Sequence, residues 1–176
     1  MNAALIFRSA VSGDMPRIAA IIRQAQAQMR AAGSRQWQDG YPAPEDIEAD
    51  IARAYGYVLS KPAAADTEAV IAYGAVVFGT EKAYEQIEGA WLTDGDYTVV
   101  HRLAVADGEK GRGVAAEFMR RVEALARTAG VGALRIDTNF DNRYMLQLVA
   151  RAGFVYCGKI QYASGERLAF EKRLEK

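Results

Sequence analysis

The sequence has very few cysteine and histidine residues, which disulfides and many metal centres require. Its 176 residues include one cysteine, Cys157, and one histidine, His101. A single cysteine cannot form a disulfide within the chain, and one cysteine with one histidine cannot make a Cys/His metal cluster. We therefore expect neither a disulfide framework nor a bound metal.

Long apolar runs and an excess of one charge are also absent. No segment approaches the roughly 18 apolar residues that a membrane-spanning helix needs, and the N-terminus lacks the basic-then-apolar pattern of a signal peptide. Lysine plus arginine equals aspartate plus glutamate at 22 each, so no overall field attracts nucleic acid or an anionic membrane. We expect a cytoplasmic protein with a small-molecule partner, no nucleic acid and no membrane; a homodimer stays open.

Periodicity and turn residues divide the chain in the order β-α-α-β-β-β-α-β-α-β-β, without repeats or a linker. The predicted strands cover residues 5–8, 55–59, 69–78, 99–105, 134–138, 155–160 and 168–172. Helices are predicted from Met15 to Gly33, from Glu45 to Ala54, from Val114 to Gly130, and from a cap at Asp141 to Gly153; segment 81–92 stays ambiguous. The fold class is therefore α/β: one domain, residues 1–176, with a mixed sheet of about seven strands and helices on both faces.

The most informative stretch, VVHRLAVADGEKGRGVAAEF at residues 99–118, joins an apolar run to a glycine-rich loop and an amphipathic helix. Glycine lets a ligand approach the backbone closely. The first turn of the helix has amide hydrogens without helical partners, and the helix dipole adds positive charge there. With Lys110 and Arg112 beside it, this loop predicts an anion site suited to a pyrophosphate.

Two interpretations compete for this loop. Gly111, Gly113 and Ala116 fit G-x-G-x-x-G/A, and Asp137 follows about 20 residues later, as in dinucleotide-binding folds. In such folds the first glycine directly follows the strand, whereas residues 106–110 intervene here, and no second βαβ half follows. We therefore interpret the match as a coincidence of spacing.

The alternative covers most of the chain. HRLAV, then GEKGRGVA, then RIDTNFDNRYMLQLVARAGF resembles the motifs of the GNAT superfamily of acyl-coenzyme A N-acyltransferases. The family loop pattern Q/R-x-x-G-x-G/A falls on Gly108, Gly111 and Gly113, so the first position departs from it. The second motif, an asparagine opening a helix that ends in Gly-Phe, is matched by Asn142 and residues 153–154.

The resemblance implies acetyl-coenzyme A as co-substrate. Its pantetheine arm would pair with backbone groups of the central strand, and its pyrophosphate would take amides of the loop and the helix start. The implied cofactor-binding residues are Leu103, Ala104, Val105, Lys110, Gly111, Arg112, Gly113, Val114, Ala115 and Asn142. For Asn142 two roles stay open, a hydrogen bond to the arm and a cap of its own helix.

An alkylamine is almost entirely protonated at pH 7, so the transfer benefits from a base. Arylalkylamine acetyltransferases resemble this chain in His-x-Leu-Ala-Val, where the histidine draws the amine proton, and this implies His101; the other interpretation is a core histidine. Strand alternation predicts His101, Leu103 and Val105 on one face. Many relatives have a tyrosine as general acid where this chain has Val149.

Either another tyrosine replaces that acid or no acid is used, and both alternatives stay open. Tyr144 or Tyr156 could replace it, with Tyr144 the catalytic candidate, or the thiolate could leave unaided because thiols are acidic. Cys157 as a covalent acyl carrier is the weaker idea, because lone strand cysteines are usually inert.

The acceptor pocket is implied beside the segment after the first helix. Its candidate substrate-binding residues are Trp37, Tyr41 and Trp91. Trp37 and Tyr41 could instead anchor a loop on the core, and Trp91 could instead fill a gap in the core. The predicted function is direct transfer of an acetyl group from acetyl-coenzyme A to a small amine. A catalytically silent acyl-coenzyme A binding module is the alternative, suggested by Val149 and Gly108.

Overall fold

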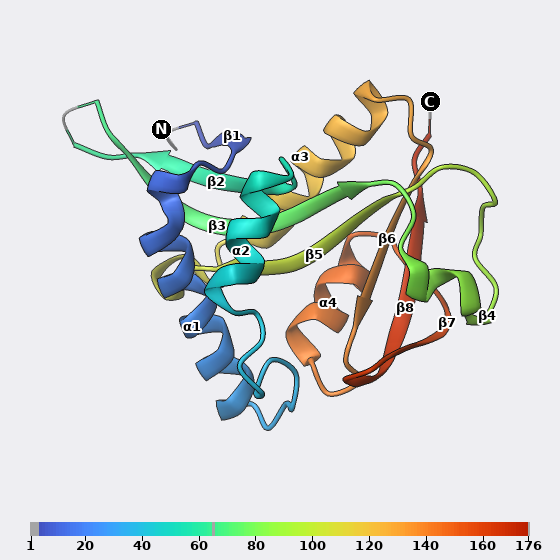
Figure 1. Ribbon diagram of the computed structural model, residues 1–176. Coiled ribbons are helices and arrows are strands. Elements are labelled where there is room, and N and C mark those ends of the chain that lie inside the picture. The colour runs from blue at the N-terminus through green and yellow to red at the C-terminus, as the bar shows by residue number, and fades with distance from the viewer. Residues whose placement is uncertain (1–3, 65, 176) are drawn as a thin grey trace.

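The computed structural model describes residues 4–64 and 66–175, and these form a mixed sheet with helices on both faces (Figure 1). Eight strands of the described chain lie in the order β1-β2-β3-β5-β6-β8-β7-β4. They are β1 (Ile6–Ser9), β2 (Gly56–Pro62), β3 (Glu68–Phe78), β4 (Glu88–Gly89), β5 (Thr98–Val105), β6 (Ala133–Thr138), β7 (Val155–Tyr162) and β8 (Gly165–Arg173). The predicted fold class is confirmed. The additional strand is the two-residue β4, in the segment that the sequence left ambiguous.

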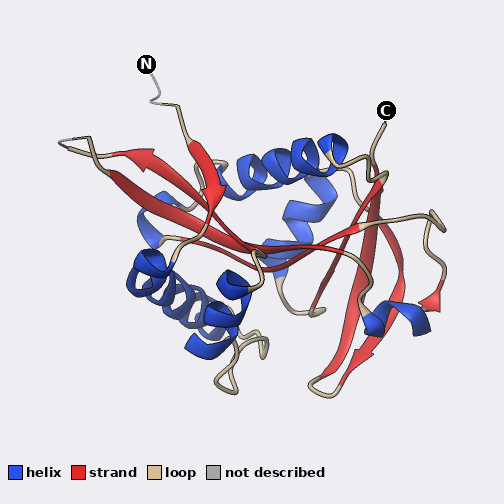
Figure 2. Cartoon of the chain, turned by 45° about the horizontal axis from the view of Figure 1, so that its top comes forward, coloured by secondary structure: helices blue, strands red, loops and turns tan. Residues whose placement is uncertain are grey.

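Four α-helices cover the sheet: α1 (Met15–Ala31), α2 (Pro44–Ala52), α3 (Val114–Thr128) and α4 (Arg143–Arg151). Figure 2 shows helices on both sides of the strands. α3 buries Val114, Phe118 and Val122, four residues apart, in one core with Val149 of α4. α1 and α2 pack on the opposite face, where Ile18 and Ile47 share a second core with Val58 and Tyr73. The helical periodicity of the sequence therefore corresponds to two cores, one on each face.

The sheet opens between β5 and β6, its parallel pair. Only Thr98 with Leu134 and Val99 with Arg135 are paired between these strands in the described residues, although β5 continues to Val105. In Figure 1 the two strands run apart from their paired ends. The second half of β5 therefore pairs with β3 alone and has a free backbone edge facing the opening.

A β-bulge interrupts β5 at the start of this free half. Ala75 of β3 pairs with His101 and Tyr73 pairs with Ala104, so two β5 residues oppose the single residue Gly74. Arg102, in the bulge, has φ of 55°. The bulge breaks the alternation of side chains along the strand.

The predicted common face for His101, Leu103 and Val105 is therefore wrong. Leu103 packs in the core under α3, and Val105 packs against the same core. His101 lies on the other side of the sheet, where its imidazole contacts Glu81. A regular two-residue period could not foresee this switch, because the bulge adds one residue between them.

Candidate active site

The opening between β5 and β6 leads to a cavity of about 770 Å³ on the α3 and α4 side. Its lining includes most of the residues that the sequence connected with the donor: Leu103, Ala104, Val105, Lys110, Gly111, Gly113, Val114, Ala115 and Asn142. Arg112 is the exception, because its side chain is 68% exposed and lies 3.7 Å from Glu109. We call this cavity the donor pocket.

The glycine loop leaves the helix start open to the donor pocket. Gly111 and Gly113 have φ of 75° and 78°, a conformation that side chains other than glycine rarely adopt. A Cβ built at either position meets no atom within 4 Å, so the space above the backbone is free. The first-turn amides of α3 and the free edge of β5 are thus both accessible. These features fit a pyrophosphate and an extended pantetheine arm.

Asn142 caps α4 and also connects the two sides of the site. Its Oδ1 accepts from the Met145 amide at 3.2 Å, and its Nδ2 donates to Gln36 Oε1 at 2.9 Å. The cap interpretation is therefore confirmed, and the prediction of Asp141 as the cap is wrong. Asp141 instead accepts from the Ser34 hydroxyl at 2.6 Å and so fastens the loop after α1.

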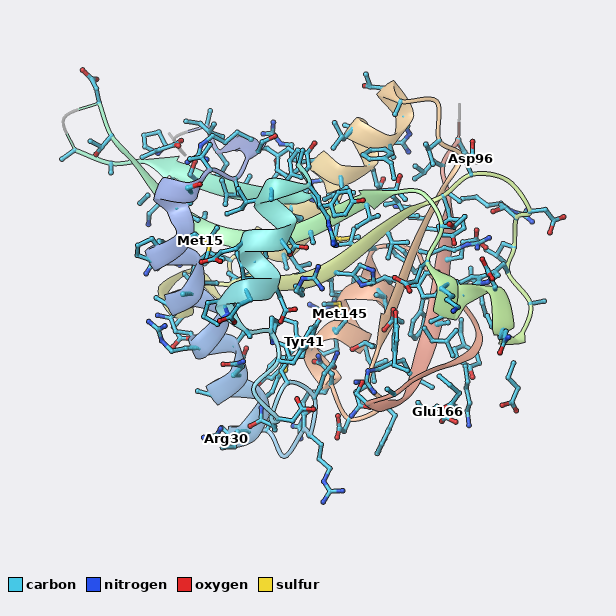
Figure 3. All side chains as sticks on the ribbon, in the orientation of Figure 1. Met15, Arg30, Tyr41, Asp96, Met145 and Glu166 are labelled. Atoms are coloured by element: carbon cyan, nitrogen blue, oxygen red, sulfur yellow. The ribbon has the colours of Figure 1, made fainter. Side chains whose placement is uncertain are left out.

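Gln36 is a site residue that sequence reasoning missed. Its Oε1 accepts from Thr138 Oγ1 and the Asn139 amide, both at 3.2 Å, in addition to Asn142. Gln36 thereby ties the loop after α1 to the end of β6 and the start of α4 (Figure 3, in which Tyr41 marks the loop and Met145 marks α4). Only its contacts across the fold identify it.

The structure separates the candidates for the missing acid. Tyr144 lines the donor pocket and its side chain is half exposed, whereas Tyr156 makes an edge-to-face contact with Phe170 outside both pockets. Val149 is buried in the core. Cys157 is buried, its thiol donates to the Val155 carbonyl at 3.4 Å, and burial raises the pKa of that thiol.

A second cavity of about 730 Å³ lies on the other side of β5. Val100, His101 and Arg102 line it, so neighbouring segments of one strand border both cavities. Trp37 and Tyr41, two of the candidate substrate-binding residues, also line it. We call this cavity the acceptor pocket.

Trp91 lines neither pocket. Its indole donates to the Tyr84 carbonyl at 3.0 Å, and the guanidinium of Arg135 lies 4.2 Å from its ring centre. The same guanidinium binds Glu171, which is completely buried. Trp91 therefore packs over a buried ion pair, and its core interpretation describes the structure.

His101 is held by a carboxylate in the acceptor pocket. Its Nε2 lies 3.2 Å from Glu81 Oε2, and the hydrogen bond from His101 lowers the pKa of Glu81. Because a carboxylate only accepts, this contact places the proton on Nε2. In the neutral ring Nδ1 is then the basic atom, and it accepts no hydrogen bond from any described residue.

The bulged residue Arg102 is fixed from the acceptor side. Its guanidinium forms an ion pair with both oxygens of Asp50, which is buried in α2, and donates to the Tyr41 hydroxyl at 2.6 Å. Asp50 also accepts from the Tyr73 hydroxyl at 2.5 Å. This network holds the bulge, and with it the orientation of His101.

Asp137, which the dinucleotide pattern would place beside the glycine loop, lies in the acceptor pocket instead. Its carboxylate accepts from the hydroxyls of Tyr84 and Tyr162. The interpretation of that pattern as coincidental agrees with this location.

Comparison with known proteins also indicates an acetyltransferase. The model of the acetyltransferase (GNAT) family matches residues 22–154. A GNAT-family acetyltransferase structure from Streptococcus agalactiae is 33% identical, with a TM-score of 0.87, over 100% of this chain and 99% of that one. A putative acetyltransferase from Staphylococcus aureus is 25% identical, with a TM-score of 0.71, over 97% and 99% of the chains. No curated protein matches the sequence.

A more distant structure shows the same fold. It is a putative acetyltransferase from Salmonella typhimurium with its cofactor acetyl-coenzyme A, 15% identical, with a TM-score of 0.66 over 99% of this chain and 96% of that one. The chain belongs to the GNAT family of acetyltransferases.

Two further findings concern the described residues alone. No helix among them combines the length and the apolar composition needed to cross a bilayer. No three of their histidine, cysteine, aspartate or glutamate side chains come together as a metal-binding group.

Proposed function

We propose that the protein transfers an acetyl group from acetyl-coenzyme A directly to a small amine. The observation that carries this proposal is the pair of cavities on either side of one strand: β5 has a free edge toward the donor pocket and presents His101 to the acceptor pocket. Acetyl-coenzyme A supplies an acetyl thioester. The chain's own residues bind and orient the two substrates and deprotonate the amine.

The donor is held mainly by backbone groups in this proposal. The amides at the start of α3 and the loop glycines Gly111 and Gly113 take the pyrophosphate, and the free edge of β5 at residues 103–105 takes the pantetheine arm. A free strand edge pairs with an extended chain as a neighbouring strand would. One of its amides can also donate to the thioester carbonyl, an interaction that contributes about 3 kcal/mol in other enzymes.

The acceptor amine must lose a proton before or during attack. An alkylammonium of ordinary pKa is neutral to only about one part in 2,500 at pH 7, equivalent to about 4.6 kcal/mol. His101 takes this proton on Nδ1, and Glu81 stabilises the imidazolium that forms. This arrangement of carboxylate, imidazole and substrate proton is that of a general base with a positioning partner.

Thiol release with the purified protein, acetyl-coenzyme A and a panel of amines, amino acids, polyamines and peptides tests the proposal. Release that depends on an acceptor, together with the acetylated product by mass spectrometry, supports transfer. Tight binding of acetyl-coenzyme A without acceptor-dependent release would instead favour a silent binding module.

A further inference from the structure

Asp137 of β6 is a carboxylate in the acceptor pocket that forms no ion pair with any described residue. Its Oδ2 accepts from the hydroxyls of Tyr84 at 2.7 Å and Tyr162 at 3.0 Å. These donors are neutral, so they solvate the charge without balancing it. The guanidinium of Arg167 acts on it through space only. The pocket therefore contains a carboxyl group whose charged form no described residue balances by contact.

One oxygen of this carboxylate is open to the pocket. Among the side-chain nitrogen and oxygen atoms of residues 4–64 and 66–175, only Thr98 Oγ1 is both fully buried and without a hydrogen-bond partner. Any other such atom without a partner therefore has some accessible surface. Oδ1 of Asp137 accepts no hydrogen bond from those residues, so it reaches the space of the pocket. His101 lines the same space. A ligand group can thus contact Oδ1 in the cavity that contains the candidate base.

The surroundings favour a cation at that oxygen. Burial raises the pKa of Asp137, which means that the folded chain penalises its charged form. Burial also raises the pKa values of Tyr84 and Tyr162, so both hydroxyls keep their protons near neutral pH and stay donors. A positively charged ligand with N–H donors would offset the penalty and use the open oxygen.

We propose that Asp137 is the anchor for the ammonium group of the acceptor, with Oδ1 accepting one of its N–H groups in the pocket that also presents His101. An alkylammonium has three donors, so one can bind Asp137 while another faces a base. The acceptor class is then a primary alkylamine that is charged before reaction, rather than an aromatic amine that is neutral at pH 7. The inference rests on the proposed function for the meaning of the pocket.

The test is calorimetric titration of the protein saturated with coenzyme A, which cannot react. The probes are n-butylamine, benzylamine and 1,4-diaminobutane at pH 7, with aniline as the neutral control. The variants are Asp137→Asn, which keeps an oxygen for both tyrosines, and Asp39→Asn, which removes the same charge from an exposed residue of the same pocket. We expect at least one alkylamine to bind the wild type and to bind Asp137→Asn at least tenfold more weakly. Asp39→Asn and the aniline affinity should each change less than threefold.

Three outcomes would overturn the anchor: no alkylamine binds the wild type, Asp137→Asn binds as tightly, or aniline loses affinity equally. A second measurement uses only the wild-type protein, so it does not depend on whether a variant folds. The carboxyl ¹³C resonance of Asp137 in the labelled wild type should move on addition of the alkylamine that binds, and not with aniline. An unmoved resonance would also overturn the proposal.

The anchor and the proposed activity fail in different ways. Asp137-dependent amine binding without any acetyl transfer would leave the anchor standing and refute the activity. Acetyl transfer with the same amine KM in wild type and Asp137→Asn would support the activity and refute the anchor.

Discussion

Gly113 and Gly130 form a matched pair at the two ends of α3. Their φ angles are 78° and 75°, and a Cβ built at either residue meets no atom within 4 Å. Alanine at each position therefore costs the same backbone strain, about 1–2 kcal/mol. For a chain of this length that lowers Tm by roughly 2–8 °C. The two residues differ in one respect, because Gly113 lines the donor pocket and Gly130 does not.

The methyl group of Gly113→Ala would enter the space where the donor pyrophosphate is proposed to lie. We expect acetyl-coenzyme A to bind this variant at least tenfold more weakly, about 1.4 kcal/mol, and Gly130→Ala to bind it like the wild type. Calorimetry gives Kd directly, and thermal unfolding with ligand gives an independent value. At 100 times the wild-type Kd, the ligand should stabilise the wild type by about 2.7 kcal/mol and Gly113→Ala by about half of that. Equal affinity in both variants, within threefold of the wild type, would refute the location of the pyrophosphate.

Three further predictions use other parts of the structure. His101→Gln should lower kcat/KM by about 10²-fold, and a kcat/KM within threefold of the wild type would make His101 structural. Tyr144→Phe should lower kcat about 10²-fold without changing the Kd of acetyl-coenzyme A, whereas kcat within threefold of the wild type would mean that the thiolate leaves unaided. Gly74→Ala should lower the free energy of unfolding by about 1–3 kcal/mol in urea, because its Cβ would lie 2.8 Å from two ring carbons of the buried Phe118. Gly132→Ala, with open space at its Cβ, is the control and should show no such loss.

The elements and the donor pocket could be predicted because their signals are local. The apolar stripe of Val114, Phe118 and Val122 determines which face of α3 is buried. The glycines before that helix mark the open turn within a few residues of sequence. Such features depend on neighbours along the chain, and a sequence displays those neighbours directly.

The acceptor pocket depends on contacts between distant segments, so the sequence shows little of it. Glu81 meets His101 from a segment without clear periodicity, and Gln36 meets Asn142 across 106 positions. The sequence drew attention to Asp137 only as part of the dinucleotide-binding pattern, which belongs to another fold. Trp91 and Trp37 look alike in the sequence, and only contacts in the fold, such as that of Trp91 with the buried Arg135, distinguish them.

The bulge in β5 explains why both pockets can share one strand. In a regular strand His101 and Leu103 would face the same way, and the imidazole would lie with the core residues beneath α3. The extra residue turns Leu103 to the α3 side and leaves His101 on the other. The bulge leaves Arg102 with a φ of 55°. This conformation costs about 1–3 kcal/mol and persists only where the surroundings impose it.

Asp50 imposes it, since this buried carboxylate would lack a cationic partner if the guanidinium of Arg102 moved away. The ion pair and the bulge therefore stabilise each other across the strand. Tyr41 donates nothing to Asp50 directly, but its hydroxyl accepts from Arg102 and joins the acceptor loop to the same network. The conformation that places His101 on the side opposite the donor pocket is thus held by α2 and by the loop of the acceptor pocket itself.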